Sequence, residues 1–144
     1  MATTVKRLLD LKGRNVWWVT PETVVYDALK LMADKDIGAV LVLKDGKLVG
    51  IFSERDYARK VILKGKSSKE TTVGELMSKK VFYVSPDQTL EECMALMTEE
   101  HIRHLPVLEN GELVGIVTIG DVVHGIIKDQ KFTIEELQRY IIGG

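Results

Sequence analysis

The stretch Gly115-Ile116-Val117-Thr118-Ile119-Gly120-Asp121 has a counterpart 65 residues earlier, Gly50-Ile51-Phe52-Ser53-Glu54-Arg55-Asp56. Each stretch begins at the end of an apolar, β-branched run. Each then supplies a small hydroxyl residue and, three positions later, an aspartate. A Ser or Thr followed three residues later by an acidic residue is typical of a capped helix start. Both stretches therefore predict a corner at which a strand turns into a helix.

Two interpretations of these corners remain open. In the first, the hydroxyl and the carboxylate only hold the helix end together as a capping box. In the second, the helix N-terminus offers N–H groups and a positive dipole end to an anion, and the aspartate accepts both hydroxyls of a ribose. The shorter Asp in place of the usual Glu or Gln favours the second, as does a glycine three residues before the hydroxyl, which permits close approach. We interpret the stretches as candidate nucleotide-binding corners.

The corners belong to a tandem duplication. Adding 65 to the residue number aligns residues 16–62 with residues 81–127 without a gap. Many equivalent positions carry the same residue, among them Val16 and Val81, Pro21 and Pro86, Gly46 and Gly111, and Asp56 and Asp121. We predict a first repeat over residues 4–65, a second over 72–128 and a C-terminal helical tail over 129–144, with the repeats forming one compact module.

Each copy reads as strand, helix, strand, strand, helix. A short strand, 16–19 or 81–84, ends before a proline, and a helix with one apolar face follows. A hairpin comes next, with its turn at Asp45-Gly46 or Asn110-Gly111. A unit of about 60 residues is marginal alone. We therefore expect an α/β (α+β) fold, in which two βαββα repeats, each with a small mixed sheet, pack about a pseudo-two-fold axis.

Composition argues against several partners. The chain has 144 residues, 45% of them hydrophobic, with 20 basic against 21 acidic side chains. There is no overall field to attract nucleic acid or a membrane surface. No apolar run approaches the length that spans a bilayer, and residues 1–10 lack the hydrophobic stretch of a secretory signal. We expect a cytoplasmic protein that binds neither nucleic acid nor membrane.

The reactive residue types give no sign of chemistry. Cys93 is the single cysteine and falls at helical core spacing with Leu90 and Met97, so we expect a buried structural thiol. His101 and His104 stand three apart at a helix-to-strand junction, without a cysteine or carboxylate that completes a ligand set, and we expect no metal. Ser53 and Thr118 have no histidine partner in the sequence, which argues against a nucleophile. The chain reads as a binding protein and not an enzyme.

Two further features lie outside the corners. Trp17 and Trp18 are adjacent on a short strand, so alternation predicts one ring in the core and one exposed. The exposed ring would contact another subunit or lie under a helix of its own repeat. In the tail, Thr133 with Glu136 predicts a further capping box and a separate helix over 134–141. That helix would pack back on the module or against a second chain.

The combined pattern resembles a known family. The order of its features is similar to that of the CBS domain, named after cystathionine beta-synthase. These features are an early Ser or Thr followed by Pro, a helix, the strand Leu105-Pro106-Val107, an Asn-Gly or Asp-Gly hairpin and the motif Gly-x-x-Thr/Ser-x-x-Asp. Two in tandem resemble the paired regulatory module of free-standing bacterial proteins. The resemblance covers residues 4–128, nearly the whole chain.

The resemblance implies a sensor of adenosine-containing molecules, namely AMP, ADP, ATP, S-adenosylmethionine or NAD(H), bound in the cleft between the repeats. It implies that Asp121 takes the ribose hydroxyls and Thr118 a phosphate or ribose oxygen, with Asp56 and Ser53 doing the same in a first pocket. Main-chain atoms near Val81 or Val16 would face the adenine, and apolar strand residues such as Pro106 would form walls. Modules of this family also imply a homodimer.

The two pockets differ in charge. Where the first copy has Gly38-Ala39, the second has Arg103-His104, a pair that in the family often reaches a phosphate. The second pocket is therefore the better equipped for a phosphate. Arg55 either closes over a phosphate from the other side or is a solvated residue on a helix face. An alternative for the whole chain is a ligand-free structural adaptor that dimerises and presents a surface to a partner protein.

Overall fold

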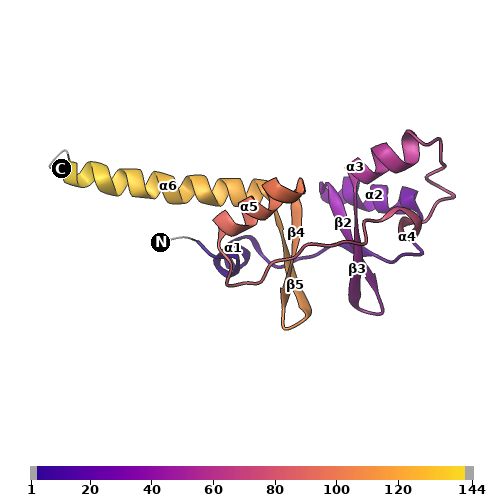
Figure 1. The fold of residues 1–144 in the computed structure, drawn as a ribbon, viewed down its shortest axis with the longest axis horizontal. Coiled ribbons are helices and arrows are strands. Elements are labelled where there is room, and N and C mark those ends of the chain that lie inside the picture. The colour runs from indigo at the N-terminus through magenta and orange to yellow at the C-terminus, as the bar shows by residue number, and fades with distance from the viewer. Residues whose placement is uncertain (1–2, 142–144) are drawn as a thin grey trace. The chain divides into compact units, whose positions relative to one another are not determined.

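The computed structural model describes residues 3–141, and the side chains of residues 3–131. The chain folds into two compact units, each a mixed α/β structure (Figure 1). Unit 1 comprises residues 1–15 and 83–144, and unit 2 comprises residues 16–82. None of the described helices combines the length and the apolar character needed to cross a bilayer.

Unit 2 is built on a three-stranded mixed sheet. Strand β2 (Ala39–Lys44) lies in the middle, parallel to β1 (Trp18–Val19) and antiparallel to β3 (Lys47–Ser53). The first four residues of β2 are buried, as expected for a central strand. Four helical segments complete the unit: α2 (Val25–Lys35), α3 (Glu54–Asp56), the π-helical η1 (Tyr57–Ile62) and α4 (Val73–Leu76).

Unit 1 repeats this plan with fewer strand residues. Strands β4 (His104–Glu109) and β5 (Glu112–Thr118) form an antiparallel pair. The predicted strand over 81–84 is reduced to one parallel bridge between Val84 and Val107. The helices are α1 (Val5–Lys12), α5 (Leu90–Glu100) and α6 (Ile119–Ile141). The predicted mixed α/β class, with a small sheet in each half, is confirmed.

Both hairpins have the turn that the sequence predicts. Asp45 and Gly46 have φ values of 53° and 77°, and Asn110 and Gly111 have 53° and 80°. Two successive residues with positive φ fit a type I′ turn, whose twist matches that of the flanking strands. The turn fixes the register of each hairpin and thereby the residues that face each other at its open end.

The leading segment of each repeat pairs with the other repeat. In unit 1, the N–H groups of Val5 and Lys6 donate to the carbonyls of Gln88 and Pro86, at 2.8 Å each. Helix α1 therefore belongs to the unit that contains the second repeat. Its sequence position, before the first repeat, gives no indication of this partner.

Unit 2 shows the same pattern with the segments reversed. The N–H groups of Val73 and Gly74 donate to the carbonyls of Thr23 and Pro21, again at 2.8 Å. Thr23 and Pro21 are the positions equivalent to Gln88 and Pro86 after the shift of 65. The sequence repeats over 4–65 and 72–128 and the two compact units are thus different divisions of the chain.

Each exchanged segment packs against a glycine of the sheet. A Cβ added to Gly115 of β5 would lie 2.8 Å from Cδ2 of Leu9, and a Cβ added to the equivalent Gly50 of β3 would lie 2.5 Å from Sδ of Met77. Leu9 is fully buried. The glycine that opens each corner stretch therefore makes room for the incoming segment, which is the reason for its recurrence.

One expectation about exposure is wrong and one is confirmed. Both Trp17 and Trp18 are exposed, at 39% and 51%, because the strand is only two residues long and Val19 takes the core position. Nζ of Lys35 lies 4.2 Å from the centroid of the Trp17 ring. Cys93 is fully buried, and burial raises the pKa of its thiol to about 11.

The tail does not form a helix of its own. Helix α6 runs without interruption from Ile119 to Ile141, so Thr133 and Glu136 lie within it and not at a helix start. The side chains of this part, with the predicted capping box, lie outside the described side chains. The separate helix was a wrong prediction because no residue between the two segments breaks the helix.

We predict that Gly115→Ala destabilises the protein by about 1 to 3 kcal/mol, because the added methyl group overpacks against Leu9. Chemical denaturation followed by circular dichroism measures the change. Gly120→Ala is the matched control, since the nearest atom to its added Cβ lies at 3.7 Å and Gly120 is within α6. A loss no larger than that of the control would contradict the assigned packing.

Candidate functional site

Strand pairing assembles the predicted residues of unit 1 at the open end of the β4–β5 hairpin. His104 and Thr118 are directly paired across the two strands. The N–H of Ile119 donates to the carbonyl of Arg103 at 2.9 Å, which extends the pairing into the first turn of α6. Arg103, His104, Thr118 and Asp121 thus meet at one corner, which we call the unit 1 corner. Pro106, two residues further along β4, is buried.

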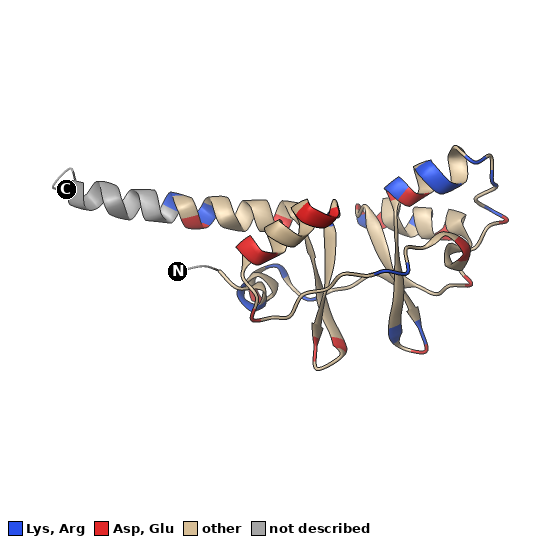
Figure 2. Ribbon diagram, in the orientation of Figure 1, with Lys and Arg blue, Asp and Glu red and all other residues tan. Residues whose placement is uncertain are grey.

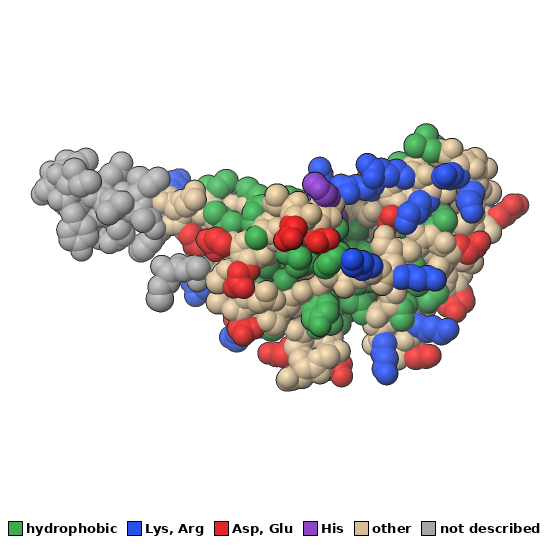
Figure 3. All heavy atoms as spheres, in the orientation of Figure 1, with side chains coloured by type: hydrophobic (Ala, Val, Ile, Leu, Met, Phe, Trp, Pro, Cys, Tyr) green, Lys and Arg blue, Asp and Glu red, His purple; other side chains and the backbone are tan. Residues whose placement is uncertain are grey.

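Unit 2 has the equivalent unit 2 corner at the open end of β2–β3. Ala39 pairs with Ser53, and the N–H of Glu54 donates to the carbonyl of Gly38 at 3.0 Å. Arg55 is exposed on α3. Lys and Arg residues recur along the α3 and η1 segment in the ribbon of Figure 2, and Figure 3 shows their side chains gathered over this part of the unit.

The remaining two predicted residues, Val16 and Val81, both belong to unit 2, Val16 as its first residue and Val81 near its end. Val81, whose main chain the resemblance implies to face an adenine, is therefore in a different unit from Asp121. Both side chains are partly buried.

At the unit 1 corner, Thr118 and Asp121 cap the start of α6 reciprocally. The N–H of Thr118 donates to Oδ2 of Asp121 at 3.1 Å, and the N–H of Asp121 donates to Oγ1 of Thr118 at 3.1 Å. Both hydrogen bonds of a capping box are therefore present at this stretch. Within the described residues, Oδ1 of Asp121 accepts no hydrogen bond.

Ser53 and Asp56 form the same arrangement. The N–H of Ser53 donates to Oδ2 of Asp56 at 3.0 Å, and the N–H of Asp56 donates to Oγ of Ser53 at 3.2 Å. Here the second carboxylate oxygen is also engaged, because Nζ of Lys60 lies 3.2 Å from Oδ1. Both aspartates therefore have a structural role, and their role toward a ligand stays a prediction.

Lys12 is the functional candidate that sequence reasoning missed. Its Nζ donates to Oδ2 of Asp121 at 2.6 Å and to the carbonyl of Ile116 at 2.9 Å. Lys12 reaches this corner because α1 packs in unit 1, although it stands 109 residues from Asp121 in the sequence. The available signal was the likeness of Thr4-Val5 to Thr72-Val73, which marks a shared leading segment.

The titration of two side chains at the unit 1 corner follows from their surroundings. Burial acts to raise the pKa of Asp121, but hydrogen bonds from Lys12 and from the N–H of Thr118 outweigh it and hold the pKa below 3.8. Burial and the adjacent Arg103 guanidinium lower the pKa of His104 below 6.5, against the opposite effect of Asp121. The corner therefore favours an ionised carboxylate at Asp121 and the neutral form of the His104 imidazole, which can both donate and accept a hydrogen bond.

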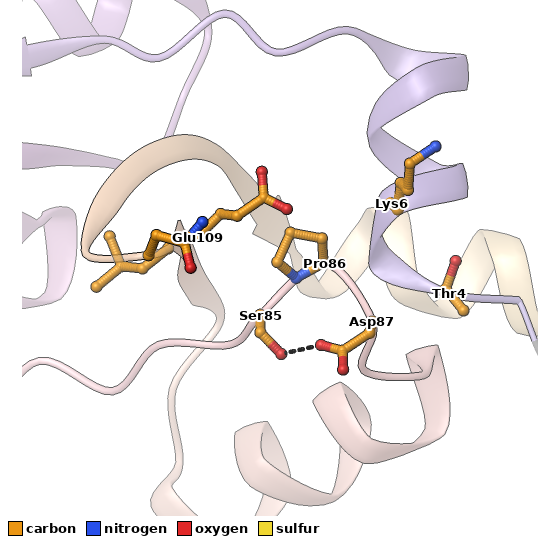
Figure 4. A pocket seen from close by; sticks show the side chains of 8 residues that line it. Thr4, Lys6, Ser85, Pro86, Asp87 and Glu109 are labelled. Atoms are coloured by element: carbon orange, nitrogen blue, oxygen red, sulfur yellow. Dashed lines mark hydrogen bonds between the residues drawn. The ribbon is translucent and has the colours of Figure 1, made fainter.

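A separate hollow lies at the other end of the β4–β5 hairpin, near its turn (Figure 4). It has a volume of about 510 Å³, and the hydroxyl of Ser85 donates to Asp87 at its floor. Its lining mixes Lys6 with Asp87 and Glu109, so it presents no single charge to a ligand. None of the residues predicted to bind a nucleotide lines it. Among the described residues, no three His, Cys, Asp or Glu side chains are grouped as metal ligands would be.

We predict that Asp121→Asn lowers the free energy of unfolding by about 1 kcal/mol at pH 7, because it weakens the helix cap and the ion pair with Lys12. The pKa of Asp121 is depressed in the folded state, so its carboxylate stabilises the fold above the unfolded pKa. That stabilisation is lost as the pH falls through the folded-state value.

Urea denaturation of the wild type and the variant, at several values from pH 7 down to about pH 3.5, measures this difference. The two proteins should converge toward the acidic end. Asp34→Asn, at an exposed aspartate of α2, is the control and should match the wild type throughout. A difference between Asp121→Asn and wild type that does not depend on pH would contradict the predicted ionisation.

Comparison with known proteins gives consistent matches along the whole chain. A family model described as the CBS domain matches residues 8–63 and again residues 73–128. The CBS domain-containing protein CBSX3, mitochondrial, of Arabidopsis thaliana is 40% identical over 152 residues, covering 99% of this chain and 74% of the relative. The protein YhcV of Bacillus subtilis is 35% identical, covering 78% of this chain and 79% of the relative.

Solved structures match equally well. A structure described as a putative signal-transduction protein with CBS domains, from Burkholderia ambifaria, has 54% identity and a TM-score of 0.86, covering 89% of this chain and 96% of that one. The CBS domain pair of protein MJ0100, solved with 5′-methylthioadenosine and S-adenosyl-L-methionine, has a TM-score of 0.78 at 24% identity, covering 90% of this chain and 99% of that one. The second likeness concerns the fold alone.

Proposed function

Since the chain belongs to the CBS-domain family, with two such domains in tandem, we propose that it is a regulatory module that senses an adenosine nucleotide at the unit 1 corner. Pairs of CBS domains are regulatory modules. The proposal adds the ligand class and the residues that hold it. It contains no chemical step, so the ligand would be released unchanged.

The observation that carries the proposal is the convergence of Lys12, Arg103 and His104 on the capped start of α6. Lys12 comes from α1, whereas Arg103 and His104 stand at the start of β4. Two separate parts of the chain would therefore supply groups for one anion. Arg103 is exposed and is a permanent cation with a planar fork that suits phosphate oxygens. The adjacent helix N-terminus favours negative charge.

The ribose would be held by Asp121. Its Oδ2 already serves the cap and Lys12, which leaves Oδ1 to accept a hydrogen bond from a ribose hydroxyl. The depressed pKa of Asp121 keeps this oxygen ionised at neutral pH, so the bond would be charge-assisted. Thr118 would contribute its hydroxyl beside it, and the buried Pro106 would serve the adenine.

The charges of this corner favour a phosphate-bearing ligand, so AMP, ADP, ATP and NAD(H) are the candidates. 5′-Methylthioadenosine, one of the two compounds in the MJ0100 structure, carries no acidic group and would not use Arg103. The unit 2 corner, with Ser53, Arg55 and Asp56, is proposed as a weaker site. There the pair Gly38-Ala39 brings no charge, and Lys60 already engages the second oxygen of Asp56.

We predict that Arg103→Ala weakens AMP binding about tenfold, because an exposed charged contact to the phosphate is lost. The same change should leave adenosine binding unaltered, since adenosine carries no phosphate. Isothermal titration calorimetry of both ligands measures the two affinities. Arg7→Ala, at an exposed arginine of α1, is the matched control and should bind AMP as the wild type does.

Asp121→Ala should weaken AMP and adenosine alike, by about 10- to 100-fold, because both carry the ribose diol. Circular dichroism confirms beforehand that the variant is folded at the titration temperature. If wild-type protein is stabilised by none of AMP, ATP, S-adenosylmethionine and NADH in a thermal-shift panel, the sensor proposal fails. That result would leave the structural adaptor as the explanation.

The cellular location stays a prediction, since the Arabidopsis relative carries the word mitochondrial in its name. Regulation itself would follow if the nucleotide binds one conformation of the chain more tightly than another.

A further inference from the structure

Charged residues are unevenly shared between the two units. Unit 2 contains twelve of the 20 basic residues and nine of the 21 acidic residues, so it is the basic unit and unit 1 is the acidic one. The expectation that the chain binds no membrane rested on the near balance of charge over the whole sequence. An anionic surface, however, responds to the charges that face it within about 10 Å, and not to the total.

Part of the basic excess lies at the end of helix η1. Arg59 belongs to η1, Lys64 and Lys66 follow it, and all three side chains are exposed. None of the three forms a salt bridge with any residue in the part of the chain whose side chains are described. Figure 3 shows Lys and Arg side chains gathered over this part of unit 2, with hydrophobic side chains beside them. These cations are therefore available to an anionic partner.

Two exposed apolar side chains lie between the cations. Ile62 is 55% exposed, and Leu63, at 77%, is the most exposed of the large hydrophobic side chains described. The helix end is closed by the N–H groups of Gly65 and Lys66, which donate to the carbonyls of Ile62 and Val61. The apolar contact that accompanies such a cap joins the residue after the glycine to the preceding turn, so it does not involve Leu63. Neither the core nor the cap accounts for a leucine at this position.

The second repeat does not have this combination. The shift of 65 pairs Arg59 with His124, Leu63 with Lys128, and Lys64 with Asp129. The exposed isoleucine recurs, since Ile127 is 56% exposed, and so does the last lysine, as Lys131. The duplicated fold therefore requires no exposed leucine between cations, and the combination is a property of the first repeat alone.

We propose that these five residues, Arg59, Ile62, Leu63, Lys64 and Lys66, which we call the basic tip, bind the surface of an anionic lipid bilayer. The cations would lie against the lipid phosphates, and the two apolar side chains would enter the boundary between headgroups and acyl chains. Basic residues near an anionic leaflet and buried apolar area each contribute to binding, and the two together anchor a protein better than either alone. The chain would be held on the surface and would not span the bilayer.

The apolar pair favours a bilayer over other anionic partners. A nucleic acid would use the cations and leave Ile62 and Leu63 in water, because bases stack on aromatic side chains and the basic tip has none. An acidic peptide is received in a groove or at a sheet edge, whereas Leu63 stands out from a helix end. A bilayer accepts a protruding leucine and its flanking cations at the same time.

Co-sedimentation of the full-length chain with lipid vesicles tests the proposal. We predict that the wild type binds vesicles of equal parts phosphatidylglycerol and phosphatidylcholine, does not bind phosphatidylcholine alone, and is released by salt. Leu63→Ala should weaken the binding about tenfold and Lys64→Ala about fivefold. Ile127→Ala and Lys128→Ala are the matched controls, because they remove an exposed isoleucine and an exposed lysine from the equivalent helix of unit 1, and they should bind as the wild type does.

A fluorescent label shows whether the tip enters the lipid. Cys93 is fully buried, so a thiol-reactive, environment-sensitive dye can be directed to Leu63→Cys. Its emission should shift to the blue on addition of the anionic vesicles, whereas the same dye on Lys128→Cys should not respond.

Four results would overturn the proposal. The wild type could fail to bind the anionic vesicles, or the control variants could weaken binding as much as the tip variants do. The dye at position 63 could fail to respond to vesicles, or could respond to a higher protein concentration without vesicles, which would mean that a second copy covers the tip. Binding to polyglutamate in place of vesicles would indicate an acidic polypeptide and would count as the first of these. Because no nucleotide is present, none of these results bears on the proposed ligand site.

Discussion

The carboxylate of Asp121 is the point through which the parts of unit 1 are joined. One of its oxygens accepts the N–H of Thr118, at the last residue of β5, and Nζ of Lys12, from the last turn of α1. The residue itself lies in the first turn of α6. A strand end, a helix start and the exchanged leading helix thus depend on one partly buried charge. Its ionised form is needed by all three, which explains its depressed pKa.

The same group limits what the corner can bind. A ligand cannot take over Oδ2 without breaking the cap, so it has to use Oδ1 and the groups around it. At the unit 2 corner Lys60 already holds the equivalent oxygen of Asp56. The duplication therefore preserved the cap in both copies, while the surrounding charges came to differ. Two differences distinguish the corners. The unit 1 corner has Arg103-His104 where the unit 2 corner has Gly38-Ala39, and its aspartate contacts Lys12 where the other aspartate contacts Lys60.

Local sequence patterns predicted the helices, strands and turns, whereas contacts between distant residues decided which segments pack together. The hairpin turns at Asp45-Gly46 and Asn110-Gly111 were predicted from sequence, and the register that they fix pairs His104 with Thr118, two residues that the resemblance had placed in one pocket. The capping box was open to two interpretations because a cap and a ribose site use the same residues. The contact of Lys12 with Asp121 depends on the exchange of leading segments, which no local pattern encodes. Trp17 and Trp18 were misjudged because alternation assumes a longer strand than the two residues present.

The two copies end differently, and one position accounts for it. After η1, Gly65 has a φ of 69°, its N–H donates to the carbonyl of Ile62, and the N–H of Lys66 donates to the carbonyl of Val61. This is a Schellman motif, which stops a helix and favours glycine.

The equivalent residue of the second copy is Gln130, which continues helix α6. Ile62 and Ile127 are exposed to nearly the same extent, so the duplicated face is shared. Only the second copy, which lacks this glycine, continues its helix as far as Ile141. One left-handed residue therefore separates a repeat whose last helix stops from a repeat whose last helix continues.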